Sequence, residues 1–332
     1  MKKPQLRWGV LSCARIAQKE VIPAIQSSQT GAVVAIASRN QELAHTVAET
    51  HQIPMVSSSY EDLIRLDSVD AVYIPLPNHL HVQWASLALE AGKHVLCEKP
   101  LGLNEQDVLL LDGVSKQYPN LTVAEAFMYK YHPQWRSANE MVIGGEIGEL
   151  RHVHVHFSYD NKDPNNIRNN LEYGGGALMD IGCYGVSVAR WFYRDEPLRV
   201  SARMKRDPRF KTDVLSTILL DFAQGSATIV CGTQMQRFQH VSLVGIHGRI
   251  CIPSPFNIPP DVEPTLEIQH DLETNRLKMP AVNQFSSQCD AFSQVVHKGS
   301  NPLNSISDAV KNMRVIDACF HSAEINAWVS IS

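Results

Sequence analysis

The first 125 residues alternate short, fully apolar runs with longer stretches that have a helical period. Fully apolar runs favour strands buried on both faces, as in a parallel sheet, and the longer stretches favour the helices that connect such strands. The expected strands are 6–11, 32–37, 71–74, 94–96 and 121–123, and the expected helices lie near 15–28, 40–50, 60–66, 80–91 and 104–117. Pro23 is expected to bend or shorten the first helix. This order predicts βαβ units around a parallel sheet.

After about residue 150 the pattern changes to runs in which apolar and polar residues alternate. Such alternation predicts an antiparallel or mixed sheet. The runs are 151–157, 214–222, 226–232 and 241–245, with turns at 224–225 and 247–248, and helices are expected near 177–192, 282–298 and 305–327. We therefore expect an α/β domain over residues 1–125 and an α+β domain over residues 126–332.

Length and composition fit two globular domains. The chain has 332 residues, of which 44% are hydrophobic and 19% are charged, and ~150 residues is typical of one domain. The formal net charge of -4 leaves no basic surplus to hold a nucleic-acid backbone or an anionic membrane. We therefore expect neither class of partner.

The cysteines and the N-terminus indicate the compartment. The seven cysteines are an odd number and include no C-x-x-C pair, so we expect neither a disulfide framework nor a zinc knuckle. The basic residues Met1-Lys2-Lys3-Pro4 precede a strand-like run rather than the apolar core of a signal peptide. No run reaches the ~18 apolar residues of a membrane span. We expect a soluble protein of the reducing cytoplasm.

The first βα junction resembles a dinucleotide fingerprint in degraded form. Laid on G-x-G-x-x-G, it places Ser12, Ala14 and Ala17 at the glycine positions. Small residues are needed there because the backbone approaches the pyrophosphate and the helix N-terminus points its N–H groups at it. The alternative is an ordinary tight βα turn. The candidate cofactor residues of this turn are Ser12, Cys13, Ala14, Arg15 and Ile16.

The end of the second strand bears on the choice of cofactor. Folds that prefer NAD usually place an acidic residue here to accept from the ribose 2′-hydroxyl, whereas this chain has Ser38 and Arg39. A guanidinium can bond a 2′-phosphate and stack on adenine, so NADP is favoured over NAD. The alternative is a solvated arginine at the start of a helix.

Three segments carry a family resemblance: Ala71–His81, Ala91–Leu101 and Gly174–Tyr184. They resemble the Gfo/Idh/MocA oxidoreductase family, as do residues 124–133, 166–168 and 309–324. The chain is most similar to the branch that contains glucose–fructose oxidoreductase, NADP-dependent xylose dehydrogenase, anhydrofructose reductase and dimeric dihydrodiol dehydrogenase. Members of this branch differ in substrate, so the resemblance selects no single sugar or diol.

The resemblance implies a fold and an activity. The fold is a Rossmann domain with a doubly wound parallel sheet, followed by an α+β domain whose large, open, mostly antiparallel sheet often makes the subunit contact, so we expect a homo-oligomer, either a dimer or a tetramer. The activity is that of an NAD(P)-dependent oxidoreductase, with NADP preferred. It would transfer a hydride between the nicotinamide and a hydroxyl or carbonyl carbon of a sugar, polyol or diol. The alternative is a non-catalytic NADP-binding regulator of the same fold.

Three residues are candidates for catalysis by this resemblance. Lys99 follows a strand, at the edge where ligands bind in an open parallel sheet. The Lys99–Pro100 bond is cis in relatives. The Lys99 ammonium would donate a hydrogen bond to the reacting oxygen. Asp180 and Tyr184 are four residues apart, on one face of the expected helix. A nearby lysine lowers the pKa of a phenol, so Tyr184 would act as acid or base and Asp180 would orient the substrate or Lys99. The alternative is a surface turn for Lys99, a packed side chain for Tyr184 and a surface carboxylate for Asp180.

Other residues are expected to contact the cofactor or substrate. In relatives, the segment after the third expected strand lines the nicotinamide ribose, and the residue before the catalytic lysine contacts the nicotinamide or its ribose. The alternative is a rigid turn with a packed His81 imidazole for the first segment, a surface carboxylate for Glu98 and an ordinary loop arginine for Arg168. The candidates are Pro75, Leu76, Asn78, His81, Glu98 and Arg168.

His152, His154 and His156 alternate along one expected strand. They therefore share a face, at about 7 Å per step. No acidic or cysteine ligand accompanies them at a distance that would close a metal site. We expect no metal there and favour a polar sheet face in a subunit contact.

Overall fold

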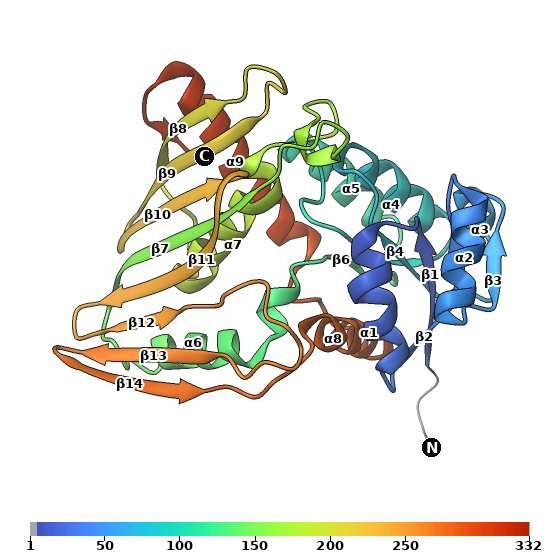
Figure 1. Ribbon diagram of the computed structural model, residues 1–332, viewed down its shortest axis with the longest axis horizontal. Helices are drawn as coiled ribbons and strands as arrows, with labels where there is room; N and C mark the ends of the chain where they lie inside the picture. The colour runs from blue at the N-terminus through green and yellow to red at the C-terminus, as the bar shows by residue number, and fades with distance from the viewer. Residues whose placement is uncertain (1–4, 332) are drawn as a thin grey trace. The chain divides into compact units, whose positions relative to one another are not determined.

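The computed structural model describes residues 5–331 and contains two compact units (Figure 1). The basic stretch Met1–Pro4 lies outside the described residues. The first unit extends to Tyr131 and also includes Asn283–Val310, and the second consists of His132–Val282 and the residues from Lys311 onward. The chain thus leaves the first unit close to the boundary expected after residue 125. Its return at residue 283 is a feature that the hydrophobic pattern does not indicate.

Within the described residues of the first unit, six strands form a parallel sheet in the order β3-β2-β1-β4-β5-β6. This is the doubly wound order, with its switch point between β1 and β4. Four of the expected strands are present to within one residue, and the fifth lies at 123–125 rather than 121–123. The additional strand β3 has three residues, too few to show a pattern. The strands are β1 (Leu6–Leu11), β2 (Gly31–Ala37), β3 (Met55–Ser57), β4 (Ala71–Ile74), β5 (His94–Cys97) and β6 (Val123–Glu125).

The helices of the first unit begin where the sequence supplies caps. Asn40, Ser59 and Asn104 each accept a hydrogen bond from the backbone N–H three residues later. The first helix continues through Pro23 to Ser27, but a π-helical turn, η1 (Ala17–Val21), precedes the proline. The α-helices of this unit are α1 (Ile22–Ser27), α2 (Gln41–His51), α3 (Tyr60–Ile64), α4 (His81–Glu90), α5 (Glu105–Ser115) and α8 (Gln284–Lys298), with 3-10 turns η2 (Asn78–Leu80) and η3 (Met128–Tyr131).

The return of the chain to the first unit depends on contacts of α8 with β1 and with the loop before β2. Trp8 of β1 is fully buried, and its ring centroid lies 5.1 Å from that of Phe292. Asp290 accepts hydrogen bonds from the hydroxyls of Ser28 and Thr30. The Trp8–Phe292 pair and the part-buried hydrogen bonds to Asp290 explain why α8 packs against this unit.

In the described part of the second unit, nine strands form a sheet in the order β14-β13-β12-β11-β7-β10-β9-β8-β15. Neighbouring strands are antiparallel except β7 and β10, which are parallel. The sheet is thus mixed but mostly antiparallel, as expected. The strands are β7 (Leu150–Asp160), β8 (Arg199–Arg206), β9 (Asp213–Phe222), β10 (Gly225–Gly232), β11 (Gln234–Gly245), β12 (Arg249–Ile252), β13 (Thr265–His270), β14 (Glu273–Lys278) and β15 (Val329–Ser330).

The expected helix near 177–192 is confirmed, in two parts. A π-helical turn, η5 (Leu178–Gly182), leads into α7 (Cys183–Tyr193), which packs on β7 and β10. The unit also contains α6 (Pro133–Ile143) and η4 (Ile167–Asn169), and the boundary between the units falls inside α9 (Ile306–Ile325). Among residues 5–331, no helix is long and apolar enough to cross a membrane.

Alternate residues of β7 face opposite sides of the sheet. Val153 and Val155 are fully buried, whereas His152, His154 and His156 are half-buried on the other face. His152 bonds the hydroxyls of two β10 residues at 2.9 Å, and His154 bonds one of them. The described residues contain no group of three or more His, Cys, Asp or Glu side chains that could hold a metal ion. The imidazoles therefore form a polar face made with neighbouring hydroxyls.

Candidate functional site

The turn after β1 has the backbone of a glycine turn although Ser12 occupies the position. Ser12 has φ 117°, in the region that glycine favours. Its N–H donates to Ala37 O at 2.8 Å, and its Oγ accepts from Ala14 N–H at 3.0 Å. The turn thus keeps the fingerprint's backbone geometry with a hydroxyl added.

The side chains of this turn face different ways. Cys13 is buried in the core of the first unit, and burial raises the pKa of its thiol. Arg15 is exposed, and Ala14 and Ile16 are half-buried. Backbone groups and small side chains therefore form the accessible part of the turn, which suits a pyrophosphate bound by N–H groups.

Arg39 lies exposed at the end of β2 beside an aromatic pair. Burial raises the pKa of Tyr60, while the charge of Arg39 and hydrogen bonds with it act in the opposite direction. The Tyr60 ring meets Trp84 edge-on at 5.1 Å. The pKa of His79 is lowered by burial and then by Arg39. Tyr60, Trp84 and His79 were not singled out from the sequence, because they lie 21 to 45 positions beyond Arg39.

Lys99 follows β5, and the Lys99–Pro100 peptide bond is cis. The turn is held by two buried side chains: Glu125 accepts from Leu101 N–H at 2.9 Å, and His81 Nδ1 lies 2.8 Å from Pro100 O. Both side chains are almost fully buried, at 2% and 0% exposed. The backbone on the C-terminal side of Lys99 is therefore fixed.

Glu98 and the loop after β4 lie beside this turn. The Glu98 carboxylate accepts from the hydroxyl of the buried Tyr73 at 2.6 Å, and burial raises the pKa of that phenol well above its usual value. Leu76 O lies 2.7 Å from Nε2 of His81. His81 is thus buried between two backbone carbonyls. Pro75, Leu76 and Asn78 belong to the same loop, at the carboxyl end of β4.

Asp180 is held by two partners in the second unit. It is 8% exposed; Oδ1 accepts from Arg168 Nε at 2.9 Å, and Oδ2 accepts from the Tyr159 hydroxyl at 2.5 Å. Burial and the Asp180 charge raise the pKa of Tyr159. Tyr184 is 6% exposed, with its ring 5.0 Å from that of Phe256. Tyr159 was not predicted, although the period-two pattern of β7 places it on the α7 side, with Val155.

A glycine run and one aspartate start the helix that carries Asp180 and Tyr184. Gly176 has φ 121°, and a Cβ added there would lie 2.0 Å from Asp213 Oδ1. Asp213 Oδ2 accepts from Leu178 N–H at 2.8 Å and from Ser216 Oγ at 2.6 Å. Asp213 therefore supplies from β9 the acceptor that a helix start needs.

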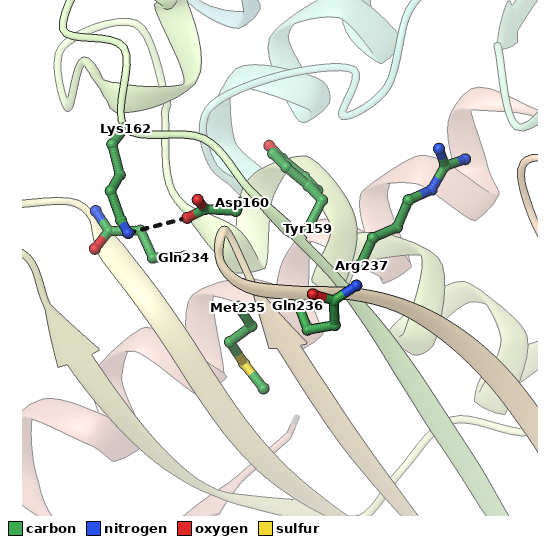
Figure 2. Close-up of a pocket in the computed structure, with 7 residues that line it drawn as sticks. All are labelled: Tyr159, Asp160, Lys162, Gln234, Met235, Gln236 and Arg237. Atoms are coloured by element: carbon green, nitrogen blue, oxygen red, sulfur yellow. Dashed lines mark ion pairs between the residues drawn. The ribbon is translucent and has the colours of Figure 1, made fainter.

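A cavity of about 510 Å³ lies at the end of β7 and the start of β11 (Figure 2). Tyr159 lines this cavity, and its hydroxyl bonds Asp180. Lys162 and Asp160, which also line it, form an ion pair of 3.4 Å. The lining residues of the cavity are Tyr159, Asp160, Lys162, Gln234, Met235, Gln236 and Arg237.

Two family models match the chain. The model for the oxidoreductase family with an NAD-binding Rossmann fold matches residues 6–116, and the model for the GFO/IDH/MocA C-terminal domain matches residues 135–251. An uncharacterised oxidoreductase of Rhizobium meliloti is 37% identical, over 98% of this chain and 99% of the relative. The D-xylose 1-dehydrogenase (NADP(+)) 2 of Haloferax volcanii is 34% identical, over 98% and 100%.

A solved structure is similar over the same length. It is a 3-ketoreductase from Actinomadura kijaniata in complex with NADP and TDP-benzene. The two chains have a TM-score of 0.91 and 32% identity, and the match covers 96% of this chain and 98% of that one.

The start of the helix that carries Asp180 gives a stability prediction. Gly176→Ala is expected to lower the free energy of unfolding by about 1–3 kcal/mol, because the new Cβ meets the buried Asp213 carboxylate at a positive φ. Urea unfolding followed by circular dichroism measures this. Gly113→Ala is the control, since a Cβ there meets nothing within 4 Å and α5 gains a better helix former. Equal stability of the two variants would contradict the prediction.

Proposed function

Because the chain belongs to the Gfo/Idh/MocA oxidoreductase family, we propose that it is an NADP-preferring dehydrogenase or reductase acting on a sugar, polyol or diol. The proposal rests chiefly on Lys99, whose turn at the carboxyl end of β5 is fixed by Glu125 and His81. That end of a doubly wound sheet is where ligands bind. The similarity to an NADP-linked xylose dehydrogenase and a 3-ketoreductase supports the substrate class.

The chain's residues fit a dinucleotide. The positive φ of Ser12 brings the turn into the backbone conformation that a bound pyrophosphate requires, and Cys13, Ala14, Arg15 and Ile16 continue that turn. Ser38 and Arg39 would receive the 2′-phosphate, with Tyr60 and Trp84 beside them. Toward the nicotinamide, the proposed contacts or supports are Pro75, Leu76, Asn78, His81, Glu98, Lys99 and Arg168.

When bound, NADP supplies or accepts the hydride. Lys99 would donate a hydrogen bond to the reacting oxygen and stabilise the charge that develops there. Tyr184 would give the proton in carbonyl reduction and take it in alcohol oxidation. Asp180 would orient the substrate hydroxyl, because Arg168 and Tyr159 already fix its two oxygens.

A regulator that binds NADP without turnover is the second candidate, favoured if only the cofactor site is functional. An assay of NADPH absorbance with aldoses, keto sugars and trans-diols separates the two. Turnover of any of these classes supports the enzyme, whereas cofactor binding with no turnover supports the regulator.

We also propose that the polar face of the second unit's sheet contacts a second copy of this chain. His240 of β11 lies opposite His156 in the register, with ring contacts to His154 at 6.4 Å. Phe238, 51% exposed, packs on His156 with its ring centroid 5.0 Å away. A half-buried polar face with an exposed aromatic ring is typical of a subunit contact.

For the lysine, Lys99→Ala is expected to lower kcat by about 10²- to 10⁴-fold, because the developing charge loses its donor. The Kd for NADPH, measured by fluorescence, should change by less than about threefold. Lys116→Ala is the control, since that side chain is 73% exposed directly after α5. Unchanged kcat in the Lys99 variant would remove this residue from the chemistry.

For the cofactor, Arg39→Asp is expected to move the preference from NADP toward NAD by at least about tenfold in the ratio of kcat/KM values, because a carboxylate repels a 2′-phosphate. Steady-state kinetics with both cofactors measures the ratio. Arg65→Asp makes the same charge change at an exposed position after α3. An unchanged ratio for Arg39→Asp would show that this residue does not read the phosphate.

For the subunit contact, the oligomer is expected to dissociate as pH falls below about 6.5, the ordinary pKa of histidine. Burial lowers the pKa of His152, His154, His156 and His240, so these rings gain their charge below that value. Two copies in contact would then bring like charges together on the shared face, and such charges repel. Sedimentation equilibrium at each pH measures the mass. A constant monomer mass would refute the contact, and His156→Gln should weaken the pH dependence.

A further inference from the structure

His81 connects the two loops that follow β4 and β5. Nδ1 lies 2.8 Å from Pro100 O and Nε2 lies 2.7 Å from Leu76 O. The ring is 0% exposed, so water does not compete for either nitrogen. One buried side chain thus touches the turn that carries Lys99 and the loop at the proposed nicotinamide end of the site.

The two contacts are not equivalent in every protonation state. A carbonyl oxygen only accepts, and a neutral imidazole has one N–H, so a neutral ring donates to Pro100 or to Leu76, and an imidazolium donates to both. Burial lowers the pKa of His81 to about 4; the two carbonyls act to raise it, and the charges of Lys99 and His79 act to lower it. The ring therefore has one N–H near neutral pH. Either tautomer finds an acceptor at hydrogen-bond distance.

Each contact has a separate structural consequence. Pro100 directly follows Lys99, so the tautomer with its N–H at Nδ1 donates to Pro100 O and fixes the backbone that orients the lysine. Leu76 lies between β4 and η2, so the tautomer with its N–H at Nε2 donates to Leu76 O and fixes the loop that precedes Asn78. Glu125 also holds the lysine turn, through Leu101 N–H. The ring of His81 lies within hydrogen-bond distance of both loops.

We propose that His81 is a positioning residue for the reaction, whose single N–H orients Lys99 through Pro100 O in one tautomer or shapes the cofactor loop through Leu76 O in the other. This role rests on the proposed function of Lys99. It differs from direct cofactor contact, because both ring nitrogens are directed at backbone oxygens. It predicts that the two contacts can be separated by mutation.

Asparagine and glutamine separate the two contacts because their amide nitrogens lie at the positions of Nδ1 and Nε2, respectively. His81→Asn can keep the bond to Pro100, and His81→Gln can keep the bond to Leu76. If Nδ1 carries the proton, we expect His81→Gln to lower kcat by about 10- to 100-fold and His81→Asn to change it little. If Nε2 carries the proton, we expect His81→Asn to raise the Kd for NADP by about tenfold or more and His81→Gln to change it little. His45→Asn and His45→Gln, at an exposed position on α2, are the matched controls.

Hydrogen exchange gives a readout that needs no turnover. If Nδ1 carries the proton, mass spectrometry of the peptide that contains Leu101 should show faster exchange in His81→Gln than in His81→Asn, because only the former loses the bond to Pro100. If Nε2 carries the proton, the peptide that contains Leu76 should exchange faster in His81→Asn. If wild type turns over no sugar or diol, the proposed function fails while the Kd and exchange results still test His81. The same pattern in both variants, or no change in either, would overturn the role of His81.

The wild-type ring gives a test that does not depend on variant folding. Nitrogen-15 NMR of the ring should show one slowly exchanging N–H and no titration between about pH 5.5 and about pH 8. A ring that titrates near the ordinary value of about 6.5, with a rapidly exchanging N–H, would overturn the proposal.

Discussion

The proposed chemistry depends on hydrogen bonds from buried side chains to the backbone of the turn after β5. Glu125 accepts from Leu101 N–H, and His81 lies within hydrogen-bond distance of Pro100 O. A buried carboxylate or imidazole that loses its partner is costly, because water cannot replace the bond. These contacts therefore hold the backbone that follows Lys99.

The second unit uses the same principle. Asp213 reaches across from β9 to the start of the helix at Leu178, and Gly176 leaves the space that its carboxylate occupies. Asp180, two residues after Leu178, is held by Tyr159 and Arg168. In both units a buried acidic group fixes backbone or side chain next to a residue proposed to act on substrate. Preorganisation of this kind lets polar groups stabilise charge without rearranging during the reaction.

The residues proposed to select the cofactor and the cavity next to Tyr159 lie in different parts of the chain. Arg39 and its aromatic neighbours Tyr60 and Trp84 form an exposed cluster at the end of β2. The cavity next to Tyr159 lies in the other unit and carries charges of both signs. Relatives of similar identity act on xylose and on dTDP-linked keto sugars.

The sequence by itself determined the elements and the chemistry-bearing motifs. The strands of the first unit, the helix that carries Asp180 and Tyr184, and the turn at Lys99 all follow from local periodicity or from contiguous motifs. Periodicity did not reveal β3, whose three residues are too few to show a pattern, or the return of the chain at residue 283.

Tertiary structure decided the partners. The positive φ of Ser12, the bond from Tyr159 to Asp180, the reach of Asp213 to Leu178 and the position of His81 between two carbonyls could not be derived from spacing. The physical reason is that periodicity reports which face of an element is buried. Which polar groups meet in the interior depends instead on how segments far apart in the chain pack together.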